Sequence, residues 1–207
     1  MRQRLEEIRE RVREHGIRPV AVLVWRVLRD RIRPPWNLLY WIPVAEGKSV
    51  SMPPGAEFVM ISDRSKDLTP LQQEALNRSF AADLMLADQR LARGAALHIL
   101  FVDGRLAGTL FTVTGKTQRF QHILLTERDA MVLDARIVPA FRGKGLYPVL
   151  LARSVEALRA AQLERLYIET AETNTASLRS YDKVGFRYLG RHRPLGRERY
   201  RYSDRPL

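Results

Sequence analysis

Residues 142 to 148, RGKGLYP, place two glycines around a lysine, directly after an apolar run and directly before a helical pattern. Where a strand passes through a glycine-containing turn into a helix, backbone N–H groups and the positive end of the helix dipole point at one spot. Arg142 and Lys144 add positive charge, and Pro148 has no N–H to donate. The stretch predicts an anion site between residues 143 and 147 that suits a pyrophosphate, although an ordinary turn would have the same pattern.

The loop matches neither of the common nucleotide-binding fingerprints. The chain has no GxxxxGK[ST], and no GxGxxG with an acidic residue after the next strand. The loop alone therefore does not predict which anion binds, and residues outside it must be considered.

A second motif, NTASLRSYDKVGF, follows the loop by about thirty residues. Together with IVPAFRGKGLY it resembles the GNAT superfamily of acyl-CoA-dependent N-acyltransferases. That family has a strand ending in V-x-P, then R-x-x-G-x-[GA] and a helix, and later N-x-x-[AS]-x-x-x-Y-x-K-x-G-F. Beside Ile137 to Pro139, the matching positions are Arg142, Gly145, Asn174, Ser177, Tyr181, Lys183, Gly185 and Phe186. Tyr147 departs from the pattern, since the family has glycine or alanine there, and its ring would narrow the pantetheine channel or stack beside it.

The resemblance implies that acyl-CoA, most simply acetyl-CoA, lies between two parallel strands, here 130–138 and 165–170, with its pyrophosphate on the RGKG loop. A backbone N–H near Ile137 or Val138 would polarise the thioester carbonyl, because its ladder partner has moved away. The residues expected to bind the cofactor are Ile137, Val138, Arg142, Gly143, Lys144, Gly145, Leu146, Tyr147, Asn174 and Ser177.

The resemblance also implies direct transfer of the acyl group to a primary amine. Tyr181 matches the family's general acid, which protonates the departing thiolate, although it could instead be a core tyrosine. The candidates for the base are Asp134, Glu169 and Glu172. The alternative is that they are surface carboxylates without a catalytic role. The acceptor could be an amino sugar, an amino acid, another small amine or a protein amine. A non-catalytic module that binds acyl-CoA or a partner is the alternative function.

The elements that must position these residues follow from the hydrophobic periodicity. We expect strands at 57–62, 97–102, 105–114, 129–138, 165–170, 186–192 and 197–203. Four helices are expected: one that begins near residue 67, a second that ends at Arg93, and two that span 144–162 and 175–184. Asp103-Gly104 favours a tight hairpin turn between two of the strands. This order predicts an α/β (α+β) fold with a mixed sheet covered by helices, and the resemblance implies a mostly antiparallel sheet with a central splayed parallel pair.

Composition limits the classes of function. The 207 residues are 45% hydrophobic, enough for one core, and the absence of cysteine excludes disulfides and thiolate metal sites. The four histidines are scattered, so we expect no metal. A net charge of +12 favours an anionic partner such as nucleic acid, a membrane surface or a polyphosphate cofactor, and the absence of a nucleic-acid-binding motif disfavours the first.

The N-terminal part forms a separate prediction. Residues 1–56 are expected to be a basic helical extension followed by an irregular, proline-rich connector over 34–56, with the acyltransferase domain at 57–207. The arm at 1–43 carries ten arginines before Pro34, interleaved with tryptophan and leucine. It would either lie on an anionic membrane or pack on the domain or on a second copy in a homodimer. Its apolar run is too short to span a bilayer, and nothing suggests export, so we expect a cytoplasmic protein.

Overall fold

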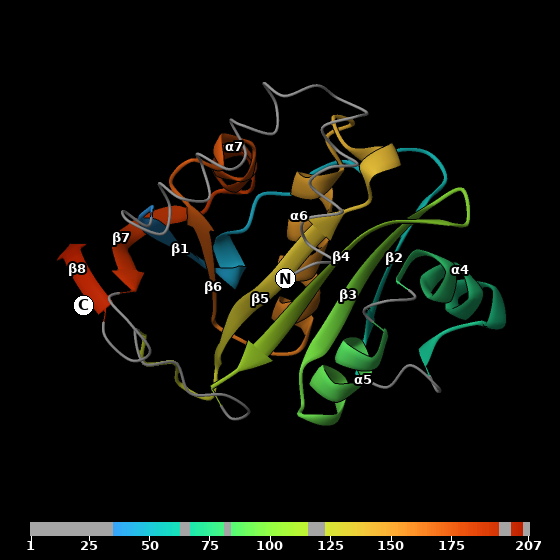
Figure 1. The fold of residues 1–207 in the computed structure, drawn as a ribbon, viewed down its shortest axis with the longest axis horizontal. Coiled ribbons are helices and arrows are strands. Elements are labelled where there is room, and N and C mark those ends of the chain that lie inside the picture. Colours follow the sequence, from blue (N-terminus) through green and yellow to red (C-terminus); the bar gives the residue numbers. More distant parts are fainter. Residues whose placement is uncertain (1–34, 63–66, 81–83, 116–122, 195–199, 205–207) are drawn as a thin grey trace, which may run out of the picture.

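A mixed sheet of eight strands runs through the described residues, in the order β2-β3-β4-β5-β6-β1-β7-β8 (Figure 1). The computed structural model describes residues 35–62, 67–80, 84–115, 123–194 and 200–204. The strands are β1 (Asn37–Pro43), β2 (Ala56–Ile61), β3 (Ala96–Val102), β4 (Arg105–Thr114), β5 (Asp129–Ile137), β6 (Arg165–Ala171), β7 (Arg187–Pro194) and β8 (Tyr200–Asp204). The helices are α4 (Pro70–Phe80), α5 (Leu84–Ala92), α6 (Leu146–Ala160) and α7 (Thr175–Val184), with short 3-10 turns at Val44–Glu46 and Pro139–Phe141.

The sheet is antiparallel between all neighbouring strands except β5 and β6, which are parallel. From β2 onward, strands and helices follow one another in the predicted order. The predicted fold class, a mixed and mostly antiparallel sheet with one parallel pair and flanking helices, is therefore confirmed. The helical extension that we expected at the N-terminus lies outside the described residues.

Strand β1 corrects the prediction of an irregular connector over residues 34–56. Asn37–Pro43 pairs antiparallel with β6 along its whole length and with β7 on its other edge. Leu39 packs in one core layer and Ile42 in the other, so both faces of the strand are buried. The flanking prolines suggested a connector, yet Pro43 is the last residue of the strand, where a missing N–H costs little. The sheet thus includes residues well before position 57.

The described part of the arm packs on the domain. The Trp41 ring, which the membrane interpretation placed at a lipid surface, stacks on Tyr167 with 6.5 Å between ring centroids. Residues 1–34 lie outside the described residues, so lipid binding by that segment stays a prediction. Among the described helices, none is long and apolar enough to cross a membrane.

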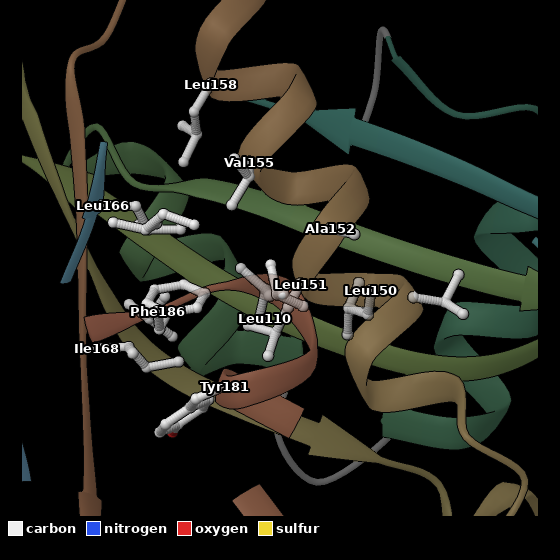
Figure 2. Packing of buried hydrophobic residues seen from close by; sticks show 14 of the residues in the cluster. Leu110, Leu150, Leu151, Ala152, Val155, Leu158, Leu166, Ile168, Tyr181 and Phe186 are labelled. Carbon is white, nitrogen blue, oxygen red and sulfur yellow. The ribbon is translucent and has the colours of Figure 1, made fainter. Parts of the chain in front are cut away.

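Two hydrophobic layers hold the helices against the sheet. One layer lies under α6 and α7, and Figure 2 shows Leu150, Leu151, Val155 and Leu158 of α6 facing this core. These four side chains are at most 3% exposed, as the helical periodicity predicted. The second layer lies on the opposite face, under α4 and α5.

The β3–β4 hairpin turns through Asp103 and Gly104, as predicted. Both have positive φ, 49° and 69° respectively, which is the backbone of a type I′ turn. An added Cβ on Gly104 would meet no atom within 4 Å. Gly104 is thus a glycine required by backbone conformation alone.

Candidate active site

The two parallel strands separate in the middle of the sheet. Pairing between β5 and β6 ends at Met131 and Tyr167, whereas β4 and β5 remain paired as far as Gly108 and Ile137. Figure 1 shows β5 and β6 side by side at one end and diverging toward α7. The second half of β5 therefore presents one backbone edge to a gap, and this gap is the splay that the resemblance implied.

The backbone N–H groups along this edge differ in direction. Of the two N–H groups predicted as alternatives, Ile137 or Val138, that of Val138 donates to the Ala107 carbonyl at 2.9 Å and is therefore occupied. Because N–H direction alternates along a strand, the Arg136 N–H also faces β4 and the Ile137 N–H faces the gap. Ile137 remains the candidate donor to a thioester carbonyl.

The RGKG loop connects β5 to α6. The Arg142 Nε donates to the Ile137 carbonyl at 3.2 Å, which ties the loop back to the strand end. Gly143 and Gly145 have φ of 76° and 71°, and an added Cβ on either would meet no protein atom within 4 Å. The left-handed conformation makes glycine the favoured residue at both positions, and the space in front of both is open to a ligand.

A cavity of 780 Å³ opens at the end of the splay. It lies between the end of β5, the RGKG loop and the first turns of α6 and α7. Its walls are Ala135, Arg136, Ile137, Phe141, Arg142, Gly143, Gly145, Leu146, Tyr147, Pro148, Asn174, Ala176, Ser177 and Ser180. Most of the predicted cofactor residues thus share one cavity, while Val138 and Lys144 do not line it. The Lys144 Nζ instead lies 5.3 Å from the centre of the Phe141 ring.

Two helices begin at this cavity, α6 directly after Gly145 and α7 directly after Asn174. The Asn174 Oδ1 accepts a hydrogen bond from the Ser177 N–H at 3.3 Å, and its Nδ2 donates to Thr170 Oγ1 at 3.1 Å. Asn174 is therefore the N-cap of α7, the structural role predicted for it. The first N–H groups of two helices, with their partial positive charges, converge on the same cavity.

Tyr181 lies behind the cavity wall. Its side chain is 1% exposed, and its hydroxyl donates to the Glu169 carbonyl at a long 3.4 Å. The Tyr147 ring lies beside it, with 6.4 Å between the ring centroids. Burial raises the pKa of Tyr181 above its ordinary value of 10.0, although the neighbouring side chains of Tyr147, Thr170 and Ser177 oppose the rise.

Tyr147, in the first turn of α6, lines the cavity, and so does Ser177 in the first turn of α7. Burial, together with Tyr181, raises the pKa of Tyr147 well above 10.0. Both phenols are therefore protonated at neutral pH. The sequence singled out Tyr147 as a departure from the family pattern, but its contact with Tyr181 required the structure.

Two of the candidate bases, Glu169 and Asp134, face the α4 and α5 side of the sheet. Glu169 alternates with Ile168 along β6, and its Oε2 lies 2.8 Å from Nε2 of His192 on β7. The His192 side chain is 3% exposed and that of Glu169 is 20% exposed. Sequence reasoning missed His192, because the pairing depends on β1 holding β6 and β7 one strand apart.

The other two carboxylates have partners of a different kind. Asp134 accepts from the Arg90 guanidinium on α5 at 3.1 Å. Glu172 accepts from the Trp36 N–H at 3.1 Å, where β1 begins. Of the three candidates, Glu169 is the one whose carboxylate lies beside a histidine ring.

Comparisons with known proteins agree with this geometry. The profile of the acetyltransferase (GNAT) family matches residues 61–186, more than half of the chain. A phosphinothricin N-acetyltransferase from Streptomyces coelicolor is 38% identical over 68 residues, which are 33% of this chain and 40% of that protein. The chain therefore spans well under two thirds of this curated relative.

Solved structures share the fold at low sequence identity. A tandem GNAT protein from the clavulanic acid biosynthesis pathway superimposes with a TM-score of 0.54 at 19% identity, over 76% of this chain and 51% of that one. The glucosamine N-acetyltransferase region of a fungal multi-domain β-N-acetylglucosaminidase gives 0.53 at 17% identity, over 74% of this chain and 20% of that one.

Proposed function

The chain belongs to the GNAT family of acetyltransferases, and from this premise we propose that it transfers an acetyl group from acetyl-CoA to a primary amine. One observation carries the proposal. The cavity lies where β5 and β6 separate, and the RGKG loop and the first turns of α6 and α7 form its walls. A thioester in the gap would reach the Ile137 N–H while its diphosphate stays on the loop.

The residues at the cavity suit the anionic part of coenzyme A. Backbone N–H groups of the loop and of the α6 N-terminus supply donors, and the open space before Gly143 and Gly145 lets a diphosphate approach the backbone. Arg142 lines the same wall and adds a guanidinium, which suits phosphate oxygens. The cofactor prediction thus fits the chemistry of the cavity.

The transfer itself needs an oxyanion donor, a base and an acid. The Ile137 N–H would stabilise negative charge that develops on the thioester oxygen as the amine attacks. Glu169, held by His192, would accept the proton that the attacking nitrogen must lose. Collapse then breaks the carbon–sulfur bond, and the departing thiolate would take a proton from the Tyr181 hydroxyl, the acid that the motif predicts.

The acceptor is proposed only as a class. Glu169 and Asp134 lie on the α4 and α5 face, so the amine would enter from that side and the coenzyme from the α6 and α7 side. The relative from Streptomyces coelicolor acetylates phosphinothricin according to its name, so small amino acids belong among the amines to be tested.

The test is a turnover assay with the full chain. Acetyl-CoA is offered with amino acids including phosphinothricin, amino sugars, polyamines and a lysine-containing peptide, and both free thiol and acetylated product are measured. We expect equal amounts of thiol and acetylamine with at least one acceptor. Tight binding of acetyl-CoA without turnover on any amine would instead favour the non-catalytic, acyl-CoA-binding alternative.

A further inference from the structure

A second, smaller cavity lies beside the end of β5, on the α4 side of the sheet. Its volume is 190 Å³, and since a water molecule takes up about 30 Å³ in the liquid, a phosphate or carboxylate group fits. Arg78 of α4 and Arg105 of β4 lie on its wall, and none of the described residues that line it is acidic. We propose that this cavity holds an anionic group of the acceptor, so that the substrate is an amine that also carries a phosphate, phosphonate or carboxylate. This inference rests on the acetyl transfer proposed above.

The Arg105 guanidinium is held on an aromatic ring that forms part of the same wall. Its Cζ lies 5.5 Å from the centre of the Phe141 ring, and Phe141 is 8% exposed. Within the part of the chain that the structure describes, Arg105 forms no ion pair. A guanidinium held over an aromatic face can still donate its N–H groups to an anion. The positive charge of Arg105 is therefore positioned at the cavity and available to a ligand.

Arg78 adds a second positive charge, which can change its partner at little cost. It pairs with Glu74, one turn earlier on α4, and the two side chains are 75% and 55% exposed. Ion pairs as exposed as this one contribute little to stability, so Arg78 can turn from Glu74 to a bound anion. Arginine suits phosphate and carboxylate oxygens because its planar group donates two parallel hydrogen bonds. Two arginines from different elements can thus contact one anion.

The small cavity is separate from the cavity that suits coenzyme A. Among the described residues, only Phe141 lines both. The large cavity has the RGKG loop and the first turns of α6 and α7 as its walls, whereas the small one has α4, which packs on the opposite face of the sheet. The acceptor was proposed to enter from that opposite face. The anionic group in the small cavity is therefore assigned to the acceptor and not to the coenzyme.

The reacting centre is close to the small cavity. Val138, on the cavity wall, directly follows Ile137, whose N–H is the candidate donor to the thioester oxygen. Their Cα atoms are about 3.8 Å apart, because the peptide between them is trans. An acceptor with a few bonds between its nitrogen and its anionic group can span this distance. The Glu169 carboxylate on the same face attracts the ammonium end, so the two kinds of charge would orient the acceptor with its nitrogen toward the thioester.

Acceptor binding to the full chain saturated with free CoA tests the site without turnover. The probes are 2-aminoethyl phosphate and ethanolamine, which differ by one anionic group, and calorimetric titration measures the Kd of each. We expect 2-aminoethyl phosphate to bind about tenfold more tightly, and Arg105→Gln to remove this difference, because a charge-assisted hydrogen bond is lost. Arg78→Gln should reduce the difference less, because its side chain is mostly exposed. Arg128→Gln, the control, removes the same charge from a 64% exposed side chain at the opposite end of β5 and should change neither Kd.

Two binding results would overturn the proposal. One is equal affinity of the wild-type chain for the two amines, or an equal effect of Arg105→Gln and Arg128→Gln on their affinities. The other concerns the 3′-phosphate of CoA, a second source of the same chemistry, which is tested by comparing CoA with 3′-dephospho-CoA. Arg105→Gln should leave the Kd of both coenzymes unchanged. A loss of affinity confined to CoA would assign the small cavity to the coenzyme.

Steady-state kinetics with acetyl-CoA give the second readout. The KM for 2-aminoethyl phosphate should rise about tenfold in Arg105→Gln, while kcat and the KM for acetyl-CoA stay unchanged, because the arginine binds the acceptor without taking part in the reaction. A wild-type kcat/KM for ethanolamine that equals or exceeds the value for 2-aminoethyl phosphate would overturn the inference. A chain that binds 2-aminoethyl phosphate through Arg105 yet acetylates no amine would overturn only the proposed transfer.

Discussion

Replacing Gly145 by alanine separates what the RGKG loop does for the fold from what it does for a ligand. Gly145 has a φ of 71°, where an L-residue with a Cβ costs about 1 to 2 kcal/mol. Its Cβ would meet no protein atom within 4 Å, so that strain is the only cost within the folded protein. In a chain of this size the loss lowers Tm by roughly 2 to 8 °C.

Ligand binding should suffer more than stability. The new methyl group would stand in the open space where the diphosphate approaches the backbone and would displace one charge-assisted N–H···O bond, worth about 1.5 to 3 kcal/mol. That corresponds to a roughly ten- to hundredfold weaker Kd for CoA. Calorimetric titration with CoA measures the Kd, and thermal unfolding without ligand measures the Tm.

Gly104 supplies a matched control in the same chain. Its φ is 69° and an added Cβ also meets nothing within 4 Å, but it lies in the β3–β4 turn outside the cavity. Gly104→Ala should therefore lower Tm by a similar amount and leave the Kd for CoA unchanged. If Gly145→Ala and Gly104→Ala bind CoA equally well, the loop is not the diphosphate site.

Three further results are expected. Lys144→Ala should weaken CoA binding by about 1 kcal/mol, less at high salt, because its ammonium acts as a mobile charge beside the cavity; a salt series of titrations measures this. Glu169→Gln should lower kcat about a hundredfold at saturating acetyl-CoA while Asp134→Asn changes it little, and the opposite ranking in steady-state assays would make Asp134 the base. Burial lowers the pKa of His98 from 6.5 to about 3, so below pH 6.5 the unfolded state binds a proton that the folded state does not. His98 should therefore reduce the free energy of unfolding by about 2 kcal/mol at pH 5. In His98→Gln, whose side chain can still bond to Thr112, the free energy of unfolding measured by urea titration should depend less on pH.

The sequence predicted most strands and helices because their signals are local. Asp103-Gly104 defines a turn by backbone conformation alone, and the buried face of α6 follows from a 3.6-residue period. The motif positions predicted which loop and which helix starts would meet, and the structure places both at one cavity.

The failures concern features that depend on distant partners. Strand β1 is a strand because β6 and β7 lie on either side of it, and nothing within NLLYWIP distinguishes that from an apolar connector. The Val138 N–H is occupied because Ala107 lies opposite in the register of β4 and β5. His192 was missed for the same reason, since its proximity to Glu169 exists only once the sheet is assembled.

The position of β1 has a consequence for how the chain folds. Trp36, directly before β1, bonds to Glu172, a residue 136 positions later, and β1, the first of the described strands, pairs only with strands made near the end. Such long loop closures slow folding and leave an apolar strand waiting during synthesis. Until β1 inserts, β6 and β7 each have an open edge in the middle of the sheet. Insertion of β1 between β6 and β7 would therefore be a late step in folding. A nascent chain that ends before β7 would leave the apolar strand β1 exposed to chaperones.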